Sequence, residues 1–508
     1  MSDAIFVGGG GEEHDQPQSL LLKYGNRHGL IAGATGTGKT VTLQILAEGF
    51  SDAGVPVIMA DVKGDLSGIA FPGREDAPTH AAFTARAAQI GYSDFHYRGY
   101  PVTFWDIFGR KGHPIRTTVA EMGPLLLSRL LDLTEAQEGV LNIAFRISDD
   151  EGLALLDLAD LKAMLQFLSE NATEISGRYG NVTTASVGAI QRRLLVLDNE
   201  GGTKLFGEPA LQLADLMTTA PDGRGRINIL AADQLMNSPR LYATFLLWLL
   251  SELFEELPEI GDPDKPRLVF FFDEAHLLFD GAPKALVAKV EQVSRLIRSK
   301  GVGVYFITQN PDDVPETILG QLGNRVQHAL RAFTARDQKA LRRAAETYRP
   351  NPRFDTESAI KEVATGEAVT SFLEAKGAPG MVERTLIRPP VSRLGAITDG
   401  ERAEVLAASP VAGKYDRLID RESAAEILAA RSAKAAEAPA PQEDREFNSG
   451  QRYGGSTAGQ GRKPSPAPRR SNSDSVVEAF AKSFARQLGG RSGQALVRGI
   501  LGGLFKGR

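Results

Sequence analysis

Short apolar runs alternate with helix-like segments between about residues 20 and 110. HGLIAGA (28–34), VPVIMAD (55–61) and PVTFWD (101–106) have the composition of buried strands, and VTLQILAEGF (41–50) continues the first of them as a helix. Strands that alternate with helices are typical of a parallel α/β sheet with helices on both faces. The pattern therefore predicts that residues 1–115 form the N-terminal part of such a sheet domain.

The pattern changes to helical spacing over residues 116–225, which we expect to form an α-helical insertion. Its clearest segments are LLLSRLLDLT (125–134), ALLDLADLKAMLQFL (154–168) and VGAIQRRLLVLD (187–198). Their apolar residues recur every three or four positions, as on one face of a helix.

Strand signals return over residues 226–395, the C-terminal part of the predicted sheet domain. They are RINILAA (226–232), RLVFFFDE (267–274), GVGVYFITQ (301–309) and RVQHALRAF (325–333), with helices such as 284–299 between them. EAVTSFLEAKGAPGMVERTLIRPP (367–390) predicts two more strands joined across a Gly-Pro turn.

Three segments follow the predicted core. Residues 396–434 are expected to form a helical extension, and residues 435–475, rich in Ala, Pro, Gly and Ser, a disordered linker. Residues 476–508 form a basic amphipathic tail, with large apolar residues at helical spacing. Those apolar residues are Val477, Phe480, Phe484 and Leu488.

Composition narrows the class of protein without naming a substrate. The 508 residues contain 42% hydrophobic and 24% charged residues, ordinary values for a soluble globular protein. The chain has no cysteine, which excludes disulfides and thiolate metal sites and fits a reducing compartment. The most apolar window (241–254) is too short to span a bilayer and contains Glu252, so we expect a buried helix, no transmembrane segment and a cytoplasmic location. The net charge of -5 gives no overall preference for nucleic acid.

GATGTGKT (33–40) matches the P-loop pattern G-x-x-x-x-G-K-[ST] and lies between a predicted strand and a predicted helix. The glycines let backbone N–H groups surround phosphate oxygens, and the helix N-terminus adds partial positive charge. Lys39 is expected to reach the β- and γ-phosphates, and the Thr40 hydroxyl to bind Mg²⁺. The residues expected to contact the nucleotide are Gly33, Ala34, Thr35, Gly36, Thr37, Gly38, Lys39, Thr40 and Val41.

RLVFFFDEAH (267–276) places two carboxylates, Asp273 and Glu274, at the C-terminal end of a predicted strand. Open α/β sheets bind ligands at that edge. Asp273 would hold Mg²⁺ through water, and Glu274 would orient and deprotonate the attacking water. The alternative is an acidic helix cap after a strand. Asp-Glu-Ala-His also occurs in superfamily-two helicases, but we find neither their Gln-x-x-Gly-Arg-x-x-Arg type segment nor a second recombinase-like domain.

Two further segments place polar residues after predicted strands. In ADVKGDLSG (60–68), Asp61, Lys63 and Asp65 either crowd the phosphate-binding edge or form a solvated turn. In VYFITQNPDD (304–313), Gln309 is either a turn residue or a polar group that has a role at the strand end. Its amide can both donate and accept hydrogen bonds.

Together these motifs resemble the FtsK–HerA superfamily of P-loop ATPases, and most of all its bacterial HerA-like (YjgR-type) group. The resemblance covers roughly residues 15–395 and rests on GATGTGKT, DVKGD, FFFDEAH, RSKGVGVYFITQNP and GEAVTSFL…VERTLIRPP in this order. It implies a RecA/ASCE-like P-loop NTPase fold with a mostly parallel sheet. It also implies a motor, generally hexameric, that hydrolyses ATP between subunits and moves DNA or protein through a pore.

The resemblance assigns roles to matching residues. Lys39 and Thr40 correspond to the Walker A pair, and Asp273 and Glu274 to the Walker B pair. Gln309 corresponds to the polar sensor on the strand beside Walker B, near the γ-phosphate and the attacking water.

Arg298, three residues before Gly301, corresponds to the arginine that would reach a neighbouring subunit's γ-phosphate, with Arg295 and Arg325 as alternatives. Arg298 can equally be a helix C-terminal cation that complements the helix dipole.

The sequence departs from the family before and after the shared core. About 30 residues precede Gly33, too few for the β-barrel of HerA helicases, so a HerA-style nuclease partner is not expected. Neither a membrane anchor of the FtsK type nor a winged-helix reader is evident. The insertion and the tail lie outside the shared core, so the resemblance assigns them no role.

Candidate nucleic-acid contacts come from basic segments. One is Gln191-Arg192-Arg193 in the insertion. The other contains Arg331, Arg336, Lys339, Arg342, Arg343 and Arg349, although such a run is also typical of a solvated helix face. The tail could bind DNA, an acidic membrane surface or a partner helix.

These observations lead to one main hypothesis and two alternatives. The main hypothesis is Mg²⁺-dependent ATP hydrolysis by an oligomeric ring motor that is a DNA translocase or helicase, with ATP and Mg²⁺ as cofactors. The first alternative is an ATPase that remodels or threads protein. The second is a nucleotide-gated scaffold without translocation.

Overall fold

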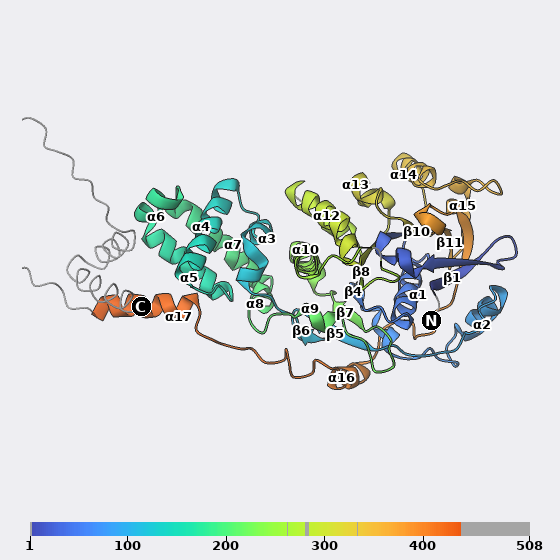
Figure 1. Ribbon diagram of the computed structural model, residues 1–508, viewed down its shortest axis with the longest axis horizontal. Coiled ribbons are helices and arrows are strands. Elements are labelled where there is room, and N and C mark those ends of the chain that lie inside the picture. Colours follow the sequence, from blue (N-terminus) through green and yellow to red (C-terminus); the bar gives the residue numbers. More distant parts are fainter. Residues whose placement is uncertain (1–2, 262, 280–283, 333, 438–508) are drawn as a thin grey trace, which may run out of the picture. The chain divides into compact units, whose positions relative to one another are not determined.

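The predicted strands and three others, β1, β2 and β6, assemble into one 12-stranded sheet in the computed structural model, which describes residues 3–261, 263–279, 284–332 and 334–437 (Figure 1). The strand order is β2-β1-β12-β11-β10-β3-β9-β8-β4-β7-β5-β6. The strands are β1 (Ala4–Gly10), β2 (Gln16–Leu21), β3 (Gly29–Ala32), β4 (Val57–Asp61), β5 (Val102–Asp106), β6 (His113–Pro114), β7 (Ile227–Ala231), β8 (Leu268–Phe272), β9 (Val302–Thr308), β10 (Asn324–Gln327), β11 (Glu367–Ser371) and β12 (Glu383–Ile387).

The sheet is mostly parallel, as predicted. The strands from β10 through β3, β9, β8, β4, β7 and β5 to β6 pair in parallel. The strands β11, β12, β1 and β2 continue the sheet with antiparallel pairs. The carboxyl ends of the parallel strands therefore share one edge, which we call the carboxyl edge.

The β1–β2 hairpin was not predicted from the sequence. Its first strand is AIFVGGG, in which glycines interrupt the apolar alternation that identifies a strand. The glycines permit close pairing, because a Cβ on Gly8 would lie 2.2 Å from the carbonyl oxygen of Leu386 in β12. Packing against β12, rather than local propensity, places this strand in the sheet.

Helices follow the strands in the pattern expected for α/β units. They are α1 (Lys39–Asp52), α2 (His80–Gln89), α3 (Val119–Leu130), α4 (Glu135–Glu151), α5 (Leu158–Glu170), α6 (Ala172–Tyr179), α7 (Thr184–Asn199), α8 (Gly202–Leu205), α9 (Leu213–Leu216), α10 (Pro239–Glu256), α11 (His276–Phe279), α12 (Lys284–Leu296), α13 (Glu316–Leu319), α14 (Ala335–Glu346), α15 (Thr356–Glu362), α16 (Asp399–Ala407) and α17 (Ala424–Glu437). The apolar window 241–254 lies in α10, whose residues are mostly buried. Among the described residues, no helix is both long and apolar enough to cross a bilayer.

Both faces of the central strands are buried. All five residues of β8 are buried, and every second one, Val269 and Phe271, joins a large apolar cluster that includes α1. Phe272 points to the other face, where its ring stacks on Phe306 of β9, and Phe306 in turn contacts Phe279 of α11. This explains why these strands are continuous apolar runs rather than alternating ones.

The chain divides into two compact units. The first contains residues 1–132 and 196–420, with the whole sheet, and the second contains residues 133–195 and 421–508. Of the expected insertion, residues 116–225, only residues 133–195 belong to the second unit. The helices α3, α8 and α9 belong to the first unit. Residues 438–508, which include most of the expected linker and the whole tail, lie outside the described residues.

The second unit joins segments that are distant in sequence. In α5, the Asp160 carboxylate accepts hydrogen bonds from the Ser423 hydroxyl (2.5 Å) and the Ala425 N–H (2.8 Å) at the start of α17. Arg431 of α17 also forms an ion pair with Glu151 of α4. The C-terminal part of the helical extension, α17, thus completes the helical unit of the insertion, which the sequence did not predict, whereas α16 belongs to the first unit.

A buried ion pair connects α1 to β1 and to the segment after β12. Arg388, after β12, and Glu48, in α1, have side chains that are 5% and 0% exposed, with 2.9 Å between Arg388 Nη1 and Glu48 Oε2. Arg388 also donates to the carbonyl oxygens of Phe6 in β1 and Ile45 in α1. The other Glu48 oxygen accepts from the N–H groups of Val391 and Ser392. Every charged group of the pair is thus matched, as burial requires.

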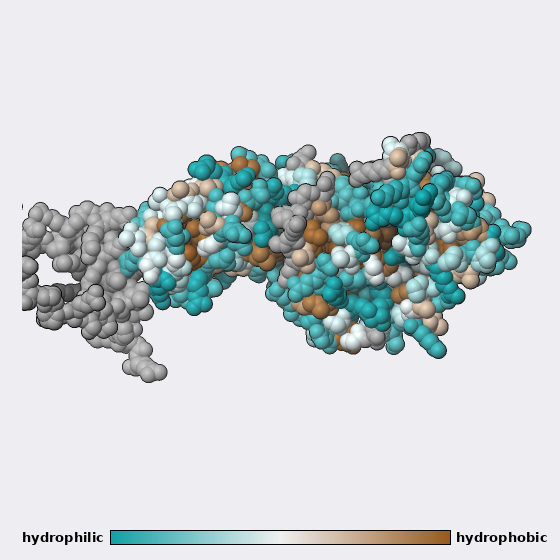
Figure 2. Space-filling view, turned by 90° about the horizontal axis from the view of Figure 1, so that it is seen from above, coloured by the Kyte–Doolittle hydropathy of each residue, from teal (hydrophilic) through white to brown (hydrophobic). Residues whose placement is uncertain are grey.

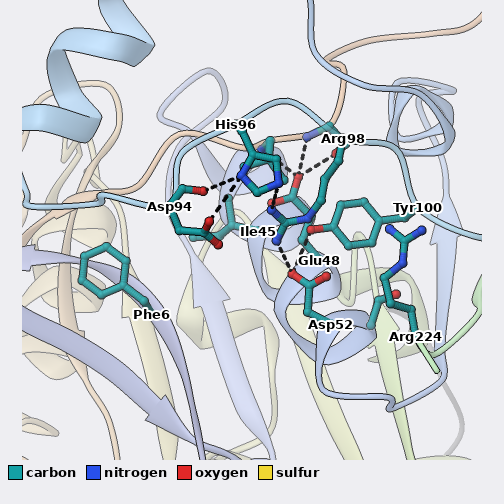
Figure 3. Close-up of polar contacts among 12 residues, drawn as sticks. Phe6, Ile45, Glu48, Asp52, Asp94, His96, Arg98, Tyr100 and Arg224 are labelled. Atoms are coloured by element: carbon teal, nitrogen blue, oxygen red, sulfur yellow. Dashed lines mark hydrogen bonds and ion pairs between the residues drawn. The ribbon is translucent and has the colours of Figure 1, made fainter. Parts of the chain in front are cut away.

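The last turn of α1 is held by a second polar network (Figure 3). The Asp52 carboxylate accepts hydrogen bonds from Arg98 (2.7 Å) and from the Tyr100 hydroxyl (3.0 Å), both in the segment before β5. The guanidinium of Arg224 lies over the Tyr100 ring, at 5.3 Å from its centroid. Together the two networks fix the helix that follows the P-loop along its length.

We expect Glu48→Gln to destabilise the protein by about 3–5 kcal/mol, because the buried Arg388 would lose its countercharge. Denaturant unfolding followed by circular dichroism would measure this loss. Replacing Glu48 and Arg388 together by methionine removes both charges and should restore much of the stability. If Glu48→Gln alone unfolded at the wild-type denaturant concentration, the ion pair would not have this importance.

Candidate functional site

The P-loop connects β3 to α1 at the carboxyl edge of the sheet. Its start is fixed by hydrogen bonds from Gly33 N–H to the Thr308 carbonyl (3.3 Å) and from Ala34 N–H to the Ala329 carbonyl (2.8 Å). Gly38, the N-cap residue of α1, has φ +115°, a conformation that favours glycine. A side chain at Gly33 would also collide with His328, because its Cβ would lie 2.5 Å from the His328 Cβ.

The first turn of α1 presents free backbone donors. Thr42 N–H makes the first intrahelical hydrogen bond, to the Gly38 carbonyl (3.0 Å), so the N–H groups of Lys39, Thr40 and Val41 have no acceptor within the helix. With the helix dipole, such groups form a ready site for phosphate. This is the geometry that the sequence motif predicts.

Lys39 is buried at this turn, with its ammonium facing the loop. Its Nζ donates to the carbonyl oxygens of Gly33 (2.6 Å) and Ala34 (3.1 Å). Burial lowers the pKa of Lys39, and the positive charge of Lys63 lowers it further. The concentration of positive charge here suits an anionic ligand.

The acidic pair follows β8 on the same edge. The Tyr242 hydroxyl donates to the Asp273 carbonyl (3.0 Å), and Asp273 Oδ1 accepts from the Glu274 N–H (2.9 Å). Glu274 is 6% exposed and has φ +47°, which is unusual for a residue with a side chain. Local strain of this kind is often found at functional sites.

The Glu274 carboxylate has three polar neighbours. Lys63 Nζ lies 3.2 Å from Oε1, and His276 Nδ1 lies 3.4 Å from Oε2. Gln309 Nε2 lies 3.5 Å from Oε2, at the outer limit of hydrogen-bond distance. These contacts join residues from the ends of three strands, β4, β8 and β9.

Gln309 lies between the two phosphate motifs. Strand β9, which it follows, pairs with β3 on one side and with β8 on the other. Its amide nitrogen faces Glu274, and its amide oxygen lies 3.5 Å from the Thr35 hydroxyl of the P-loop. Gln309 therefore touches both motifs, whereas Asn310 caps the turn that follows by accepting from the Asp312 N–H.

The loop after β4 lies at the same site, so its polar residues are not a solvated turn alone. The Asp61 carboxylate accepts from the N–H groups of Gly64 (2.7 Å) and Leu66 (3.2 Å), which shapes the loop. Burial raises the pKa of Asp61 to about 7 and that of Asp273 to about 6. The nearby negative charge of Asp65 contributes to the shift at Asp61, and that of Glu274 to the shift at Asp273.

This excess of carboxylates suits a divalent cation. Magnesium at nucleotide sites takes one or two protein oxygens and completes its shell with water and phosphate. The hydroxyl of Thr40 and the carboxylate of Asp273, at the same edge, are donors of this type. Among the described residues, no group of three or more His, Cys, Asp or Glu side chains could hold a metal alone.

The sequence did not indicate a role for His328, whose side chain packs against the P-loop at Gly33. Its Nδ1–H donates to the Glu367 carbonyl (2.9 Å), so its Nε2 accepts from the Thr42 hydroxyl (2.8 Å). Burial lowers the pKa of His328 to about 4, and the charge of Lys39 is a further cause. The imidazole is therefore neutral and couples α1 to the start of β11.

Arg298 lies at the opposite edge of the sheet from the P-loop. It occupies the 3₁₀ turn Ile297–Lys300, just before β9, and its carbonyl accepts from Asn26. A strand of seven residues such as β9 is roughly 20 Å long, so Arg298 is distant from the P-loop of its own chain. A cavity of about 370 Å³ at this edge is lined by Arg27, His28, Arg295, Arg298, Gly320, Gln321, Gly323 and Leu373.

The two alternative arginines have different surroundings. Arg325 donates to the carbonyl oxygens of Leu322 (3.0 Å) and Leu319 (2.8 Å), so its guanidinium serves the local fold. Arg295 lines the same cavity as Arg298, and its Nη2 lies 3.4 Å from the carboxylate of Glu291.

The parallel sheet, the glycine-rich loop before α1 and the acidic pair after β8 define a P-loop nucleoside triphosphatase. The chain belongs to the HerA-like helicase C-terminal family, whose model matches residues 9–508. This membership confirms the resemblance and the fold class inferred from the sequence.

Solved structures that the chain partly resembles include the plasmid coupling protein TrwB in complex with a non-hydrolysable GTP analogue. It shares 15% identity and a TM-score of 0.49, over 77% of this chain and 90% of that chain. VirB4 of Thermoanaerobacter pseudethanolicus shares 15% identity and a TM-score of 0.48, over 76% of this chain and 97% of that chain. TrwB in complex with ADP and Mg²⁺ shares 16% identity and a TM-score of 0.45, over 74% and 89%. No curated protein matches the sequence.

We expect Thr42→Val to destabilise the protein by about 1–3 kcal/mol, because a buried acceptor on His328 would lose its donor. Thermal unfolding would measure the change. Thr84→Val is a suitable control, since the exposed Thr84 hydroxyl donates to the His80 carbonyl of its own helix. We expect the control to stay within about 0.5 kcal/mol of wild type, and equal losses in both variants would contradict the role given to His328.

Proposed function

We propose that this chain is a Mg²⁺-dependent ATPase. The observation that supports this most is the meeting of four strand ends at one edge. There Gln309 contacts both the P-loop and Glu274, and Glu274 in turn contacts Lys63. Membership of the HerA-like helicase C-terminal family is consistent with a nucleotide-driven motor.

The residues of the site have different roles in phosphoryl transfer. The N–H groups at the start of α1 and the Lys39 ammonium bind and orient the phosphates. Glu274 orients the attacking water and accepts its proton, and Gln309 links this carboxylate to the P-loop through Thr35. Thr40 and, through water, Asp273 would hold Mg²⁺, which would neutralise phosphate charge.

A ring-shaped oligomer explains the position of Arg298. Because this arginine and its cavity lie across the sheet from the P-loop of the same chain, Arg298 can approach a γ-phosphate only from another subunit. We therefore propose hydrolysis between subunits of a homo-oligomer, a hexamer by resemblance to the family, with Arg298 as the donor in trans.

We propose DNA as the substrate of the motor. The surface over α13 and α14 is largely hydrophilic (Figure 2), and α14 is strongly basic. Two of its arginines are partly neutralised, Arg342 by Glu357 at 3.7 Å and Arg343 by Asp312 at 3.3 Å. Arg331 and Lys339 add positive charge to the same segment, which suits contact with a phosphate backbone. A motor that threads protein, with a protein partner bound through the C-terminal tail, and a nucleotide-gated scaffold are the alternatives.

Steady-state ATPase assays with and without single- and double-stranded DNA test this function. We expect hydrolysis that DNA stimulates, and a fall in kcat of about 10²–10⁴ in Glu274→Gln, because a general base is lost. Lys39→Ala should lose both nucleotide binding and turnover, because a phosphate ligand is removed.

Each outcome separates the hypotheses. Glu274→Gln with wild-type turnover would remove the catalytic role of Glu274. ATP hydrolysis without any effect of DNA, or of salt on DNA binding, would favour the protein-directed motor. Nucleotide-dependent assembly without hydrolysis, measured by mass photometry with an ATP analogue, would favour the scaffold.

Arg298→Ala should bind nucleotide normally but lose turnover by about 10³–10⁵, as expected for an arginine finger. Mixing Arg298→Ala with Glu274→Gln subunits should restore some activity, because mixed interfaces can combine an intact finger with an intact base. Arg295→Ala, from the same cavity, is the matched control. Normal turnover of Arg298→Ala would exclude it as the finger, and a loss in Arg295→Ala instead would transfer the role.

A further inference from the structure

Lys63 makes an ion pair with the residue that the proposed function treats as the general base. Its Nζ lies 3.2 Å from Glu274 Oε1, and it comes from the loop after the neighbouring strand β4. We propose that Lys63 is a positioning residue that holds the Glu274 carboxylate in its catalytic orientation. This inference rests on the proposed function, since it concerns the same site.

The loop that carries Lys63 is built to face Glu274. Strands β4 and β8 pair in parallel, with Met59 opposite Phe271, so their following residues leave the sheet side by side. Asp61 accepts two backbone hydrogen bonds from this loop, and Gly64, with φ +76°, completes the turn. Lys63 is thus held between an anchored strand end and an anchored turn.

The contacts of Glu274 are divided between its two oxygens. Lys63 takes Oε1, whereas His276 and Gln309 both approach Oε2. A carboxylate fixed at both oxygens cannot rotate freely, and its proton-accepting lone pairs point in defined directions. The left-handed backbone of Glu274 brings a strained residue into this position, so side-chain contacts are needed to retain it.

The other cation at the site cannot replace Lys63. The Lys39 ammonium is bonded to the carbonyl oxygens of Gly33 and Ala34 and is assigned to the phosphates. The charges nearest the pair are otherwise negative, namely Asp65 and Asp273. Among the described residues, Lys63 is the only lysine or arginine that forms an ion pair with Glu274.

The competing explanation is that the ion pair only stabilises the fold. The small stabilisation expected from it argues against this explanation. The side chain of Lys63 is 45% exposed and that of Glu274 is 7% exposed, so the pair is only half-buried, and breaking it should cost less than the roughly 3–5 kcal/mol of a fully buried pair. Lys63→Met should therefore fold normally. Its effect should appear in turnover, where a small misplacement of a catalytic group can cost about 10²-fold.

Lys111→Met is a closely matched control. Lys111 follows β5 on the same sheet edge, is 43% exposed, and forms a 2.7 Å ion pair with Asp233. Its loop is also shaped by an aspartate, because Asp106 accepts from the N–H groups of Phe108, Arg110 and Lys111. It differs from Lys63 in its partner, which is Asp233, 33% exposed, rather than Glu274, 7% exposed.

The test measures ATP turnover, ADP affinity and thermal unfolding for Lys63→Met, Lys63→Arg, Lys111→Met and Glu274→Gln. We expect Lys63→Met to lower kcat about 10–100-fold with little change in KM or in ADP affinity, and Lys63→Arg to retain most of the turnover. Lys111→Met should match wild type. Lys63→Met combined with Glu274→Gln should be no slower than Glu274→Gln alone, because both changes affect one catalytic unit.

Three results would overturn the proposal. One is unchanged turnover in Lys63→Met. Another is a further loss in the double variant, which would mean that Lys63 acts independently of Glu274. The third is a loss of ADP affinity like that of Lys39→Ala, which would make Lys63 a phosphate ligand. A wild-type protein without ATPase activity, or a fully active Glu274→Gln, would instead reject the proposed function.

Discussion

The buried pair of Glu48 and Arg388 is the interaction on which the sheet domain depends. Neither charge could be buried alone without a cost of several kcal/mol, so the segments that carry them must come together. Arg388 also bonds the Phe6 carbonyl, and Glu48 bonds the backbone after β12. One ion pair thus fixes the helix after the P-loop, the N-terminal hairpin and the last strand in a single arrangement.

A firmly held α1 gives the phosphate site a rigid base. His328 holds the first turn of the helix through Thr42, Glu48 holds its middle, and Asp52 holds its last turn. The N–H donors of the P-loop therefore keep their positions. The other polar groups of the site come from the ends of neighbouring strands. Preorganised donors of this kind stabilise developing charge without reorganisation during the reaction.

The residues proposed to be catalytic and the arginine-lined cavity are separated by the length of the strands between them. Parallel strands send their carboxyl ends to one edge, where Glu274 and Gln309 meet the P-loop, and their amino ends to the other, where Arg298 lies. The two parts of the proposed intersubunit site therefore cannot meet within one chain. This separation is the physical reason for expecting an oligomer.

The sequence alone determined the features that depend on local chemistry. Apolar runs identified the central strands, GATGTGKT the phosphate loop, and FFFDE the acidic strand end, because each is encoded within a few adjacent residues. The tertiary structure decided the rest. The glycine-rich β1, the contact of His328 with Thr42, and the joining of α17 to α5 depend on partners far away in the chain. The ion pair of Lys63 with Glu274 belongs to the same class, since more than 200 residues separate them, and only the pairing of β4 with β8 brings them together.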